Sequence, residues 1–222
     1  LSLVEPLVSG PVLVFLGDIC FGPERMESML EQFEENGACS VLAVNPEAKA
    51  DEIRMNFEVL RSEDGFVKEV NEKPEHPRGK VKGCGIYLFD KEIFGAIRRT
   101  PRTPLRHEYE ITTSIQILID DGSPVRAAEP IAWDINVTDV SDLLRANLKM
   151  LEIKGLDKLV GEGARIHPGA EVQRSVIGDN VVVSHPIQIQ DSLLLSDSRV
   201  RSEKDLHRVV VHGDHVIPRP KP

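Results

Sequence analysis

The sequence predicts an α/β domain followed by a short left-handed parallel β-helix. From about Pro11 to Leu151, short apolar runs alternate with amphipathic segments, which is the pattern of a layered α/β sheet. After Leu151 the apolar residues recur at every sixth position, which is typical of the coils of a left-handed β-helix. We therefore expect two domains, at 1–152 and 158–222, with the second including the C-terminal tail.

Composition excludes several classes of protein. The 222 residues are 41% hydrophobic, which is enough for real cores, and no stretch approaches the roughly 18 apolar residues of a membrane span. A net charge of -9 argues against nucleic acid and anionic lipid as partners. Three cysteines without a CxxC pair indicate free thiols, so we expect a cytoplasmic protein. From the net charge and the short apolar runs we expect no nucleic-acid and no membrane partners.

The first strand candidate is VLVFL, residues 12–16, behind Gly10-Pro11. Its length and its β-branched and aromatic content predict a central parallel strand that is buried on both faces. Asp18 follows at the carboxyl end, where open α/β sheets bind their ligands. Taken alone, Asp18 fits a metal ligand and a turn residue after Gly17 equally well. The first ten residues resemble the end of a helix that stops at Gly10.

The remaining elements of the first domain follow from periodicity and turn residues. Gly65 predicts the tight turn of a hairpin, and Thr138 or Asp139 is expected to cap the last helix. In chain order we expect a helix with Met26, Met29, Leu30 and Phe33 on one face, a strand at 39–45, a hairpin at 56–74, a strand at 81–90, a helix with Ile111, Ile115, Leu118 and Ile119, two short strands within 125–137, and a helix at 140–151.

Two apolar rows define the β-helix. The first row comprises Val160, Ile166, Val172, Ile177, Val183, Ile189 and Leu195, with one residue deleted before Ile177. The second comprises Ala164, Ala170, Val176, Val181, Ile187 and Leu193. We expect both rows to point into a triangular prism of two coils. Because two coils make a small core with an open end, we also expect the protein to be at least dimeric.

An ordered set of motifs carries a family resemblance: LGD, EKP, GIYLFD, HEYEITTSIQILIDDG and DLLRANLKML. In this order they resemble the sugar-1-phosphate nucleotidylyltransferases, most closely the longer glucose-1-phosphate thymidylyltransferases with a hexapeptide tail. The resemblance implies a Rossmann-like nucleotide-diphospho-sugar transferase sheet. It also implies that a hexose 1-phosphate, with glucose 1-phosphate the first candidate, attacks a nucleoside triphosphate such as dTTP to give a nucleotide-sugar and pyrophosphate. Mg2+ is the implied cofactor.

The resemblance also implies roles for individual residues. Asp18 corresponds to a Mg2+ ligand, and Lys73 of the Glu72-Lys73-Pro74 motif corresponds to the cation that holds the sugar phosphate. Glu72 corresponds to a ligand of the sugar hydroxyl groups. Taken alone, a Glu-Lys-Pro sequence after a strand is usually a solvated turn.

Two further positions have a functional and a structural interpretation. Gly85, two residues before Tyr87, lets the backbone approach the hexose, or it serves close packing of strands. Tyr87 is implied to lie beside the sugar. Glu108 contacts the sugar or caps the helix that follows it.

This sequence departs from the family pattern at three points. Asn136 aligns with the second metal-binding aspartate, and a shift of one or two residues brings Asp134 to that position instead. Phe57 aligns with a glycine that the family keeps against the sugar. The glycine-rich GGxGTRLxP loop, which cradles the triphosphate, is not among these residues, so the chain is a fragment of a longer one or has lost its nucleotide half.

Two hypotheses remain. The first is a nucleotidylyltransferase, for which we expect no pyrophosphate release from the 222 residues without the glycine-rich loop. The alternative is a non-catalytic sugar-phosphate-binding or regulatory subunit that assembles through its β-helix. The motifs do not decide which sugar, base or oligomer is involved.

Overall fold

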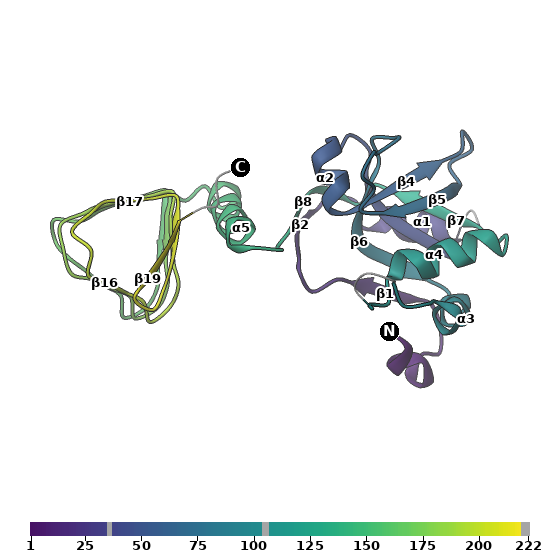
Figure 1. The fold of residues 1–222 in the computed structure, drawn as a ribbon, viewed down its shortest axis with the longest axis horizontal. Helices are drawn as coiled ribbons and strands as arrows, with labels where there is room; N and C mark the ends of the chain where they lie inside the picture. Colours follow the sequence, from purple (N-terminus) through teal and green to yellow (C-terminus); the bar gives the residue numbers. More distant parts are fainter. Residues whose placement is uncertain (35–36, 104–106, 219–222) are drawn as a thin grey trace. The chain divides into compact units, whose positions relative to one another are not determined.

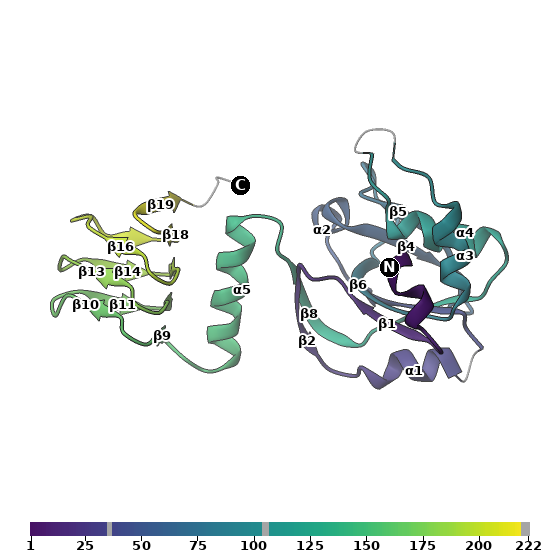
Figure 2. The same ribbon diagram turned by 90° about the horizontal axis from the view of Figure 1, so that it is seen from below.

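The computed structural model describes residues 1–34, 37–103 and 107–218. The chain folds into two compact units, Leu1–Asp134 and Ile135–Pro222. Figures 1 and 2 show the first unit as a mixed α/β domain and the second as a helix followed by a triangular solenoid. Each unit is described by itself below.

A six-stranded mixed sheet forms the centre of the first unit. Its order is β5-β4-β6-β3-β7, and β1 pairs with β6 beside this path. The strands are β1 (Val12–Phe15), β3 (Ser40–Asn45), β4 (Phe57–Arg61), β5 (Val67–Glu72), β6 (Lys82–Phe89) and β7 (Val125–Ala128). Residues of β6 are buried throughout and those of β3 nearly so, because these two strands have neighbours on both sides.

Helices cover both faces of this sheet, which gives three layers. Helices α3 (Glu92–Arg99) and α4 (Ile111–Asp120) pack on the face that carries Tyr87 and Phe89. Helix α1 (Glu27–Glu34) packs on the opposite face through Met29. A 3-10 helix, η1 (Ser2–Leu7), starts the chain, and the short α2 (Ala50–Met55) precedes β4 (Figure 2).

Strand β1 contradicts the expectation of a central parallel strand. It runs antiparallel to β6, with Val12 opposite Phe89, and half-buried residues alternate with exposed ones along it. Leu13 and Phe15 are 49% and 45% exposed. The physical reason is that β6 is the only strand paired with β1 in the described part of the chain, so one face and one edge of β1 stay uncovered.

Most of the other local predictions are confirmed. β4 and β5 form the expected hairpin, and Gly65 in its turn has φ +83°. The two short strands are β7 and β8 (Ile131–Asn136), and β8 pairs with β2 (Ile19–Pro23). Asp139 caps α5 (Val140–Ile153), because its side chain accepts hydrogen bonds from the backbone of Ser141 and Asp142.

The second unit contains the β-helix, whose three sides are parallel sheets. The sides consist of β9-β12-β15-β18, β10-β13-β16 and β11-β14-β17, and β19 adds an antiparallel strand beside β18. The strands are β9 (Lys158–Val160), β10 (Arg165–Ile166), β11 (Glu171–Gln173), β12 (Ser175–Ile177), β13 (Val182–Val183), β14 (Gln188–Gln190), β15 (Leu193–Leu194), β16 (Arg199–Val200), β17 (Leu206–His207), β18 (Val209–His212) and β19 (His215–Pro218).

The β-helix is larger than expected, and one apolar row is shifted. Three coils are completed and a fourth coil begins at β18, instead of the two coils inferred from periodicity. Leu194, not Leu195, continues the interior row after Ile189. The deletion noted before Ile177 recurs in the following coil. The backbone N–H of Ser192 donates a hydrogen bond to Oγ of Ser175, which shows that equivalent positions of successive coils are 17 residues apart and not 18.

Helix α5 covers one side of the prism. Leu144 packs with Leu193 and Val210, and Val176 and Leu195 lie at the edge of this cluster. Two members of the expected second row, Val176 and Leu193, therefore face α5 instead of the prism interior. Their strands pair in register, so the interior is filled by the alternate positions, such as Ile177 and Leu194.

The boundary between the two units differs from the limits expected from the sequence. α5 falls in the second unit, whereas the limits 1–152 and 158–222 assign it to the first domain. Among the described residues, no helix is long and apolar enough to cross a membrane.

Candidate functional site

Asp18 lies in the exposed turn that joins β1 to β2. This turn is fixed on β6, because the backbone N–H of Leu16 donates to the carbonyl oxygen of Gly85 at 3.0 Å. A Cβ at Gly85 would lie 2.0 Å from Cδ1 of Ile19 and 3.1 Å from Cδ1 of Leu16, and Gly85 has φ +65°. The glycine therefore permits both the backbone conformation and the close packing of the turn that carries Asp18.

Glu72 and Tyr87 lie near this turn. Glu72 is half-buried at the end of β5, and its Oε2 accepts a hydrogen bond from Oγ1 of Thr112 in α4 at 3.0 Å. Tyr87 in β6 is 1% exposed. Burial raises the pKa of Tyr87, and the charges of Glu72 and Asp18 raise it further. The structure thus places the carboxylates of Glu72 and Asp18 within electrostatic range of Tyr87, while the Tyr87 side chain itself is buried in the hydrophobic core.

Lys73 extends from the end of β5 into solvent. Its backbone has φ 43°, a strained value for a residue with a Cβ, and its N–H donates to the carbonyl oxygen of Asn56 at 2.7 Å. The hydrogen bond holds the strained residue in place next to Glu72. An exposed ammonium on a fixed backbone is suited to binding a phosphate.

Phe57 occupies space beside Glu72, which it faces across the β4–β5 ladder. Its ring lies against the backbone of Gly83, where a Cβ would come within 1.7 Å of the ring. The ring also stacks on Tyr87, with centroids 6.2 Å apart, and Phe57 is only 5% exposed. An aromatic side chain therefore fills the position at which the family resemblance places an open glycine.

Asp134 is committed to a buried ion pair that sequence reasoning missed. Nζ of Lys82 lies 2.5 Å from Oδ2 of Asp134, and the side chains are 5% and 3% exposed. Sγ of Cys84 lies 3.7 Å from Oδ1 of the same carboxylate, and burial raises the pKa of this thiol. With both oxygens occupied, Asp134 is unsuited to the metal role considered for it. The available signal was a lysine at the start of the otherwise uncharged strand β6.

Glu58 is a second buried charge that the sequence analysis did not find. It is 0% exposed, and its Oε1 accepts the backbone N–H groups of Arg78 and Gly79 at 2.5 and 2.6 Å. Oε2 accepts from Nδ2 of Asn71 at 3.1 Å. Glu58 thereby fixes the loop that follows the Glu72-Lys73-Pro74 motif. A single acidic residue within a hydrophobic strand was the signal.

Glu108 and Asn136 are the two remaining site candidates. Glu108 is exposed, and the N-cap of α4 is Glu110, so the capping role considered for Glu108 is wrong. Its neighbours 104–106 lie outside the described residues. Asn136 ends β8 in the second unit, so a metal site shared between Asp18 and Asn136 stays a prediction.

Asp18 fits the way in which Mg2+ is usually bound. Within residues 1–34, 37–103 and 107–218, no three His, Cys, Asp or Glu side chains cluster as a metal site. Mg2+ commonly takes only one or two carboxylates and completes its shell with water and substrate phosphates. One exposed carboxylate at the end of a strand meets that requirement.

Comparison with known proteins identifies the family and the fold of the chain. Residues 4–153 match the family described as "Nucleotidyl transferase", and residues 148–221 match "GlmU-like, C-terminal hexapeptide". The two matches overlap on α5. A solved structure of UDP-glucose pyrophosphorylase complexed with UDP-glucose shares the fold, with a TM-score of 0.59 and 20% identity over 68% of this chain and 60% of that chain.

Two curated relatives are similar in sequence. A glucose-1-phosphate thymidylyltransferase of Streptomyces antibioticus is 32% identical over 55% of this chain and 38% of its own length. A bifunctional protein GlmU of Methanocaldococcus jannaschii is 34% identical over 65% of this chain and 33% of its own length. The chain thus matches about a third of the length of each of these relatives. From the extent of the first family match, this chain belongs to the nucleotidyl transferase family, and it carries a GlmU-like hexapeptide region.

Proposed function

We propose that the first unit supplies the sugar-phosphate side of a sugar-1-phosphate nucleotidylyltransferase site. The observation that supports the proposal is that Asp18, on the turn packed over Gly85, and Glu72 both lie within electrostatic range of Tyr87, with the exposed Lys73 next to Glu72 in the chain. The reaction joins a hexose 1-phosphate to a nucleoside triphosphate and releases pyrophosphate. Glucose 1-phosphate and dTTP are the substrates we favour, following the name of the Streptomyces relative.

The charge of each site residue determines the part of the substrates that it binds. Lys73 binds the attacking phosphate with a compact positive charge, and Glu72, held by Thr112, accepts hydrogen bonds from sugar hydroxyl groups. Asp18 holds Mg2+, which when bound neutralises the reacting phosphates. Leu16 and Ile19 fix the Asp18 turn over Gly85, so the carboxylate is positioned before substrate arrives.

Ligand binding tests the sugar-phosphate site directly. Calorimetric titration of the 222-residue chain with glucose 1-phosphate should give saturable binding, and Lys73→Gln should weaken it by about 10- to 100-fold, because a charge-assisted hydrogen bond is lost. Lys68→Gln is the matched control, since Lys68 is also exposed and lies on the same strand, β5. Equal loss in both variants, or binding of glucose as tight as that of glucose 1-phosphate, contradicts the assignment.

Turnover tests the catalytic part of the proposal. In protein expressed from the complete reading frame, Asp18→Asn should keep the fold while lowering kcat for pyrophosphate release by about 100-fold or more. Asn136→Asp should tighten Mg2+ binding if Asn136 serves the same ion, because a carboxylate adds a full charge. A destabilised Asp18→Asn protein with normal turnover makes Asp18 a structural turn residue.

The alternative is a non-catalytic sugar-phosphate-binding or regulatory subunit, and Phe57 favours it. The ring on Gly83 narrows the space beside Glu72 in which a hexose would lie. Under this alternative the complete protein binds glucose 1-phosphate but releases no pyrophosphate, and Asp18→Asn leaves the dissociation constant unchanged.

We further infer that the second unit pairs with a second copy through its first coil. Leu159 and Val160 of β9 are 49% and 44% exposed, and β12 is the only strand neighbour of β9 in the described chain. Antiparallel self-pairing centred on Val160 would set Lys158 opposite Glu162 of the other copy. Light scattering should give a dimer that Leu159→Asp dissociates, while Leu3→Asp, at a site 90% exposed in the first unit, has no effect. A monomeric wild-type protein would refute this.

We also place the protein in the cytoplasm. Cys20, Cys39 and Cys84 are free thiols, a state that a reducing compartment maintains.

A further inference from the structure

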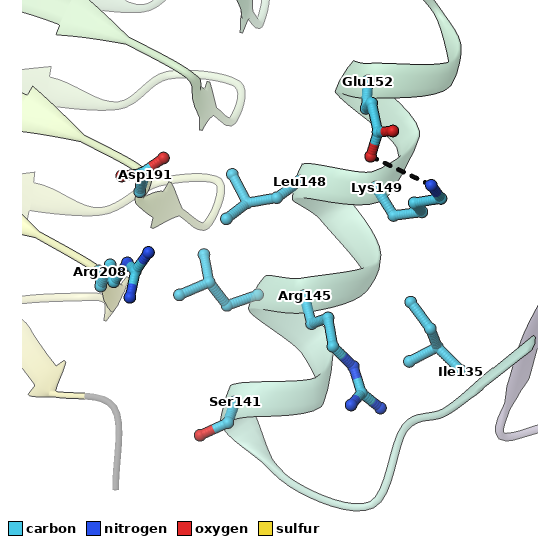
Figure 3. Close-up of a pocket in the computed structure, with 9 residues that line it drawn as sticks. Ile135, Ser141, Arg145, Leu148, Lys149, Glu152, Asp191 and Arg208 are labelled. Atoms are coloured by element: carbon cyan, nitrogen blue, oxygen red, sulfur yellow. Dashed lines mark hydrogen bonds and ion pairs between the residues drawn. The ribbon is translucent and has the colours of Figure 1, made fainter. Parts of the chain in front are cut away.

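A pocket of about 410 Å³ lies beside α5, within the second unit (Figure 3). Its helical wall comes from α5. Ser141, Leu144 and Leu148, at i, i+3 and i+7, lie toward the β-helix, and Arg145, Lys149 and Glu152 project from the other side of the helix. The opposite wall is a corner of the β-helix. A volume of this size falls within the roughly 300–1,000 Å³ of small-molecule sites.

The β-helix corner is a column of charged residues, one from each coil. Arg174, Asp191 and Arg208 follow one another at intervals of one coil, and all three have positive φ, at 41°, 49° and 53°. This conformation is costly for residues with a Cβ, and glycine or asparagine would adopt it more readily. Two arginines therefore occupy positions at which glycine, asparagine or aspartate would be favoured.

Asp191 and Arg208 line the pocket from this column. The Asp191 side chain is 8% exposed, and its Oδ2 accepts a hydrogen bond from Nη2 of Arg174 at 2.7 Å. Arg208 forms no ion pair with any residue in the described part of the chain. Figure 3 shows its guanidinium on the side of the β-helix that faces Leu148. Arg208 thus borders an apolar surface, and the carboxylate beside it on the pocket wall, Asp191, is paired with Arg174.

The α5 wall carries two more cations. Among the residues that the structure describes, Arg145 and Lys149 pair only with acidic residues three positions away on the same helix, Asp142 at 3.0 Å and Glu152 at 3.1 Å. Exposed intrahelical pairs of this kind contribute roughly 0.3–0.5 kcal/mol. Figure 3 shows both side chains projecting from α5 on the side away from Arg208, so these two cations border the pocket without approaching its guanidinium.

We propose that this pocket binds a small phosphate monoester, at a site distinct from the Asp18 and Glu72 group. The phosphate is bound by Arg208, because a guanidinium group matches the geometry of phosphate oxygens. The organic part of the ligand rests on Leu144 and Leu148, which form the apolar floor. The hydroxyl of Ser141 supplies one further hydrogen bond at the rim.

Glucose 6-phosphate is a suitable probe, and Lys73→Gln is the appropriate background. This background removes the phosphate ligand of the proposed catalytic site, so the result does not depend on that proposal. Titration followed by backbone-amide NMR should give saturable shifts in α5 and β18. Inorganic phosphate should bind more weakly, because it lacks an organic part to cover the leucines.

Arg208→Asn tests the key cation while preserving the backbone, since asparagine tolerates positive φ. It should weaken binding of glucose 6-phosphate by about ten-fold or more. Arg199→Asn is the matched control, because Arg199 is exposed on β16, a different side of the prism, and should bind normally. Absence of saturation by about 20 mM, equal affinity in Arg208→Asn, or equal affinity for inorganic phosphate overturns the proposal.

Discussion

Gly85→Ala tests whether this glycine positions the Asp18 turn by packing. The substitution combines two costs. Alanine at φ +65° is disfavoured by about 1–2 kcal/mol. Its Cβ would also lie 2.0 Å from Cδ1 of Ile19, and relief of such an overlap costs about 1–3 kcal/mol. The free energy of unfolding of the first unit should therefore fall by about 2–5 kcal/mol.

Two matched variants separate these costs. Gly122 has φ +82°, and a Cβ added there would meet no atom within 4 Å, so Gly122→Ala should lose only the backbone cost of about 1–2 kcal/mol. Ile19→Val removes the atom that clashes. In the Ile19→Val background, Gly85→Ala should therefore cost about as much as Gly122→Ala, which gives a coupling energy of about 1–3 kcal/mol between positions 19 and 85.

Urea denaturation followed by tryptophan fluorescence provides the assay. Trp133 is the only tryptophan of the chain, and it packs on Gly22 of β2, so it reports on the first unit. If Gly85→Ala costs no more than Gly122→Ala and shows no coupling to Ile19→Val, Gly85 is not a packing glycine. Selective loss of glucose 1-phosphate binding in the stable double variant would then favour the alternative that the backbone approaches the sugar.

Three further outcomes follow from buried or capping groups. Lys82→Met should destabilise the first unit by about 3–5 kcal/mol in the same urea assay, because it leaves Asp134 charged and buried. Adding Asp134→Leu should restore most of the lost stability. A double variant as unstable as the single one contradicts this expectation. Asp139→Ala should cost the second unit about 1 kcal/mol, measured by far-ultraviolet circular dichroism during denaturation, and no loss would mean that the cap hydrogen bonds are not formed in solution. Burial, reinforced by the charge of Glu92, raises the pKa of Cys39 to about 11. Because the folded thiol stays protonated while the unfolded one ionises, the free energy of unfolding should fall between pH values of about 9 and 11. Cys39→Ala should flatten this part of the profile of stability against pH.

Local patterns in the sequence were sufficient for elements whose residues contact near neighbours. The hairpin around Gly65, the cap at Asp139 and the helix stripes depend on spacings of two to four residues, so they could be predicted without a fold. The β-helix was predictable for a related reason, since each coil repeats the same environment and one period describes all of them. Lys73 and Glu72 were located by their motif, although no local pattern indicates which side chains they meet.

Only the tertiary structure decided the features that depend on partners distant in sequence. The sequence of β1 is apolar enough for a central strand, and its edge position follows from which strands pair with β6. The role of Asp134 changed because folding brings Lys82, 52 residues away, to within 2.5 Å of it. The alignment of Phe57 with a glycine could be read from the sequence, but its contact with Gly83 could not. Burial gives these charges and rings their large effect on stability. An unpaired charge or a cavity inside the protein costs several kcal/mol, whereas the same charge on the surface costs little.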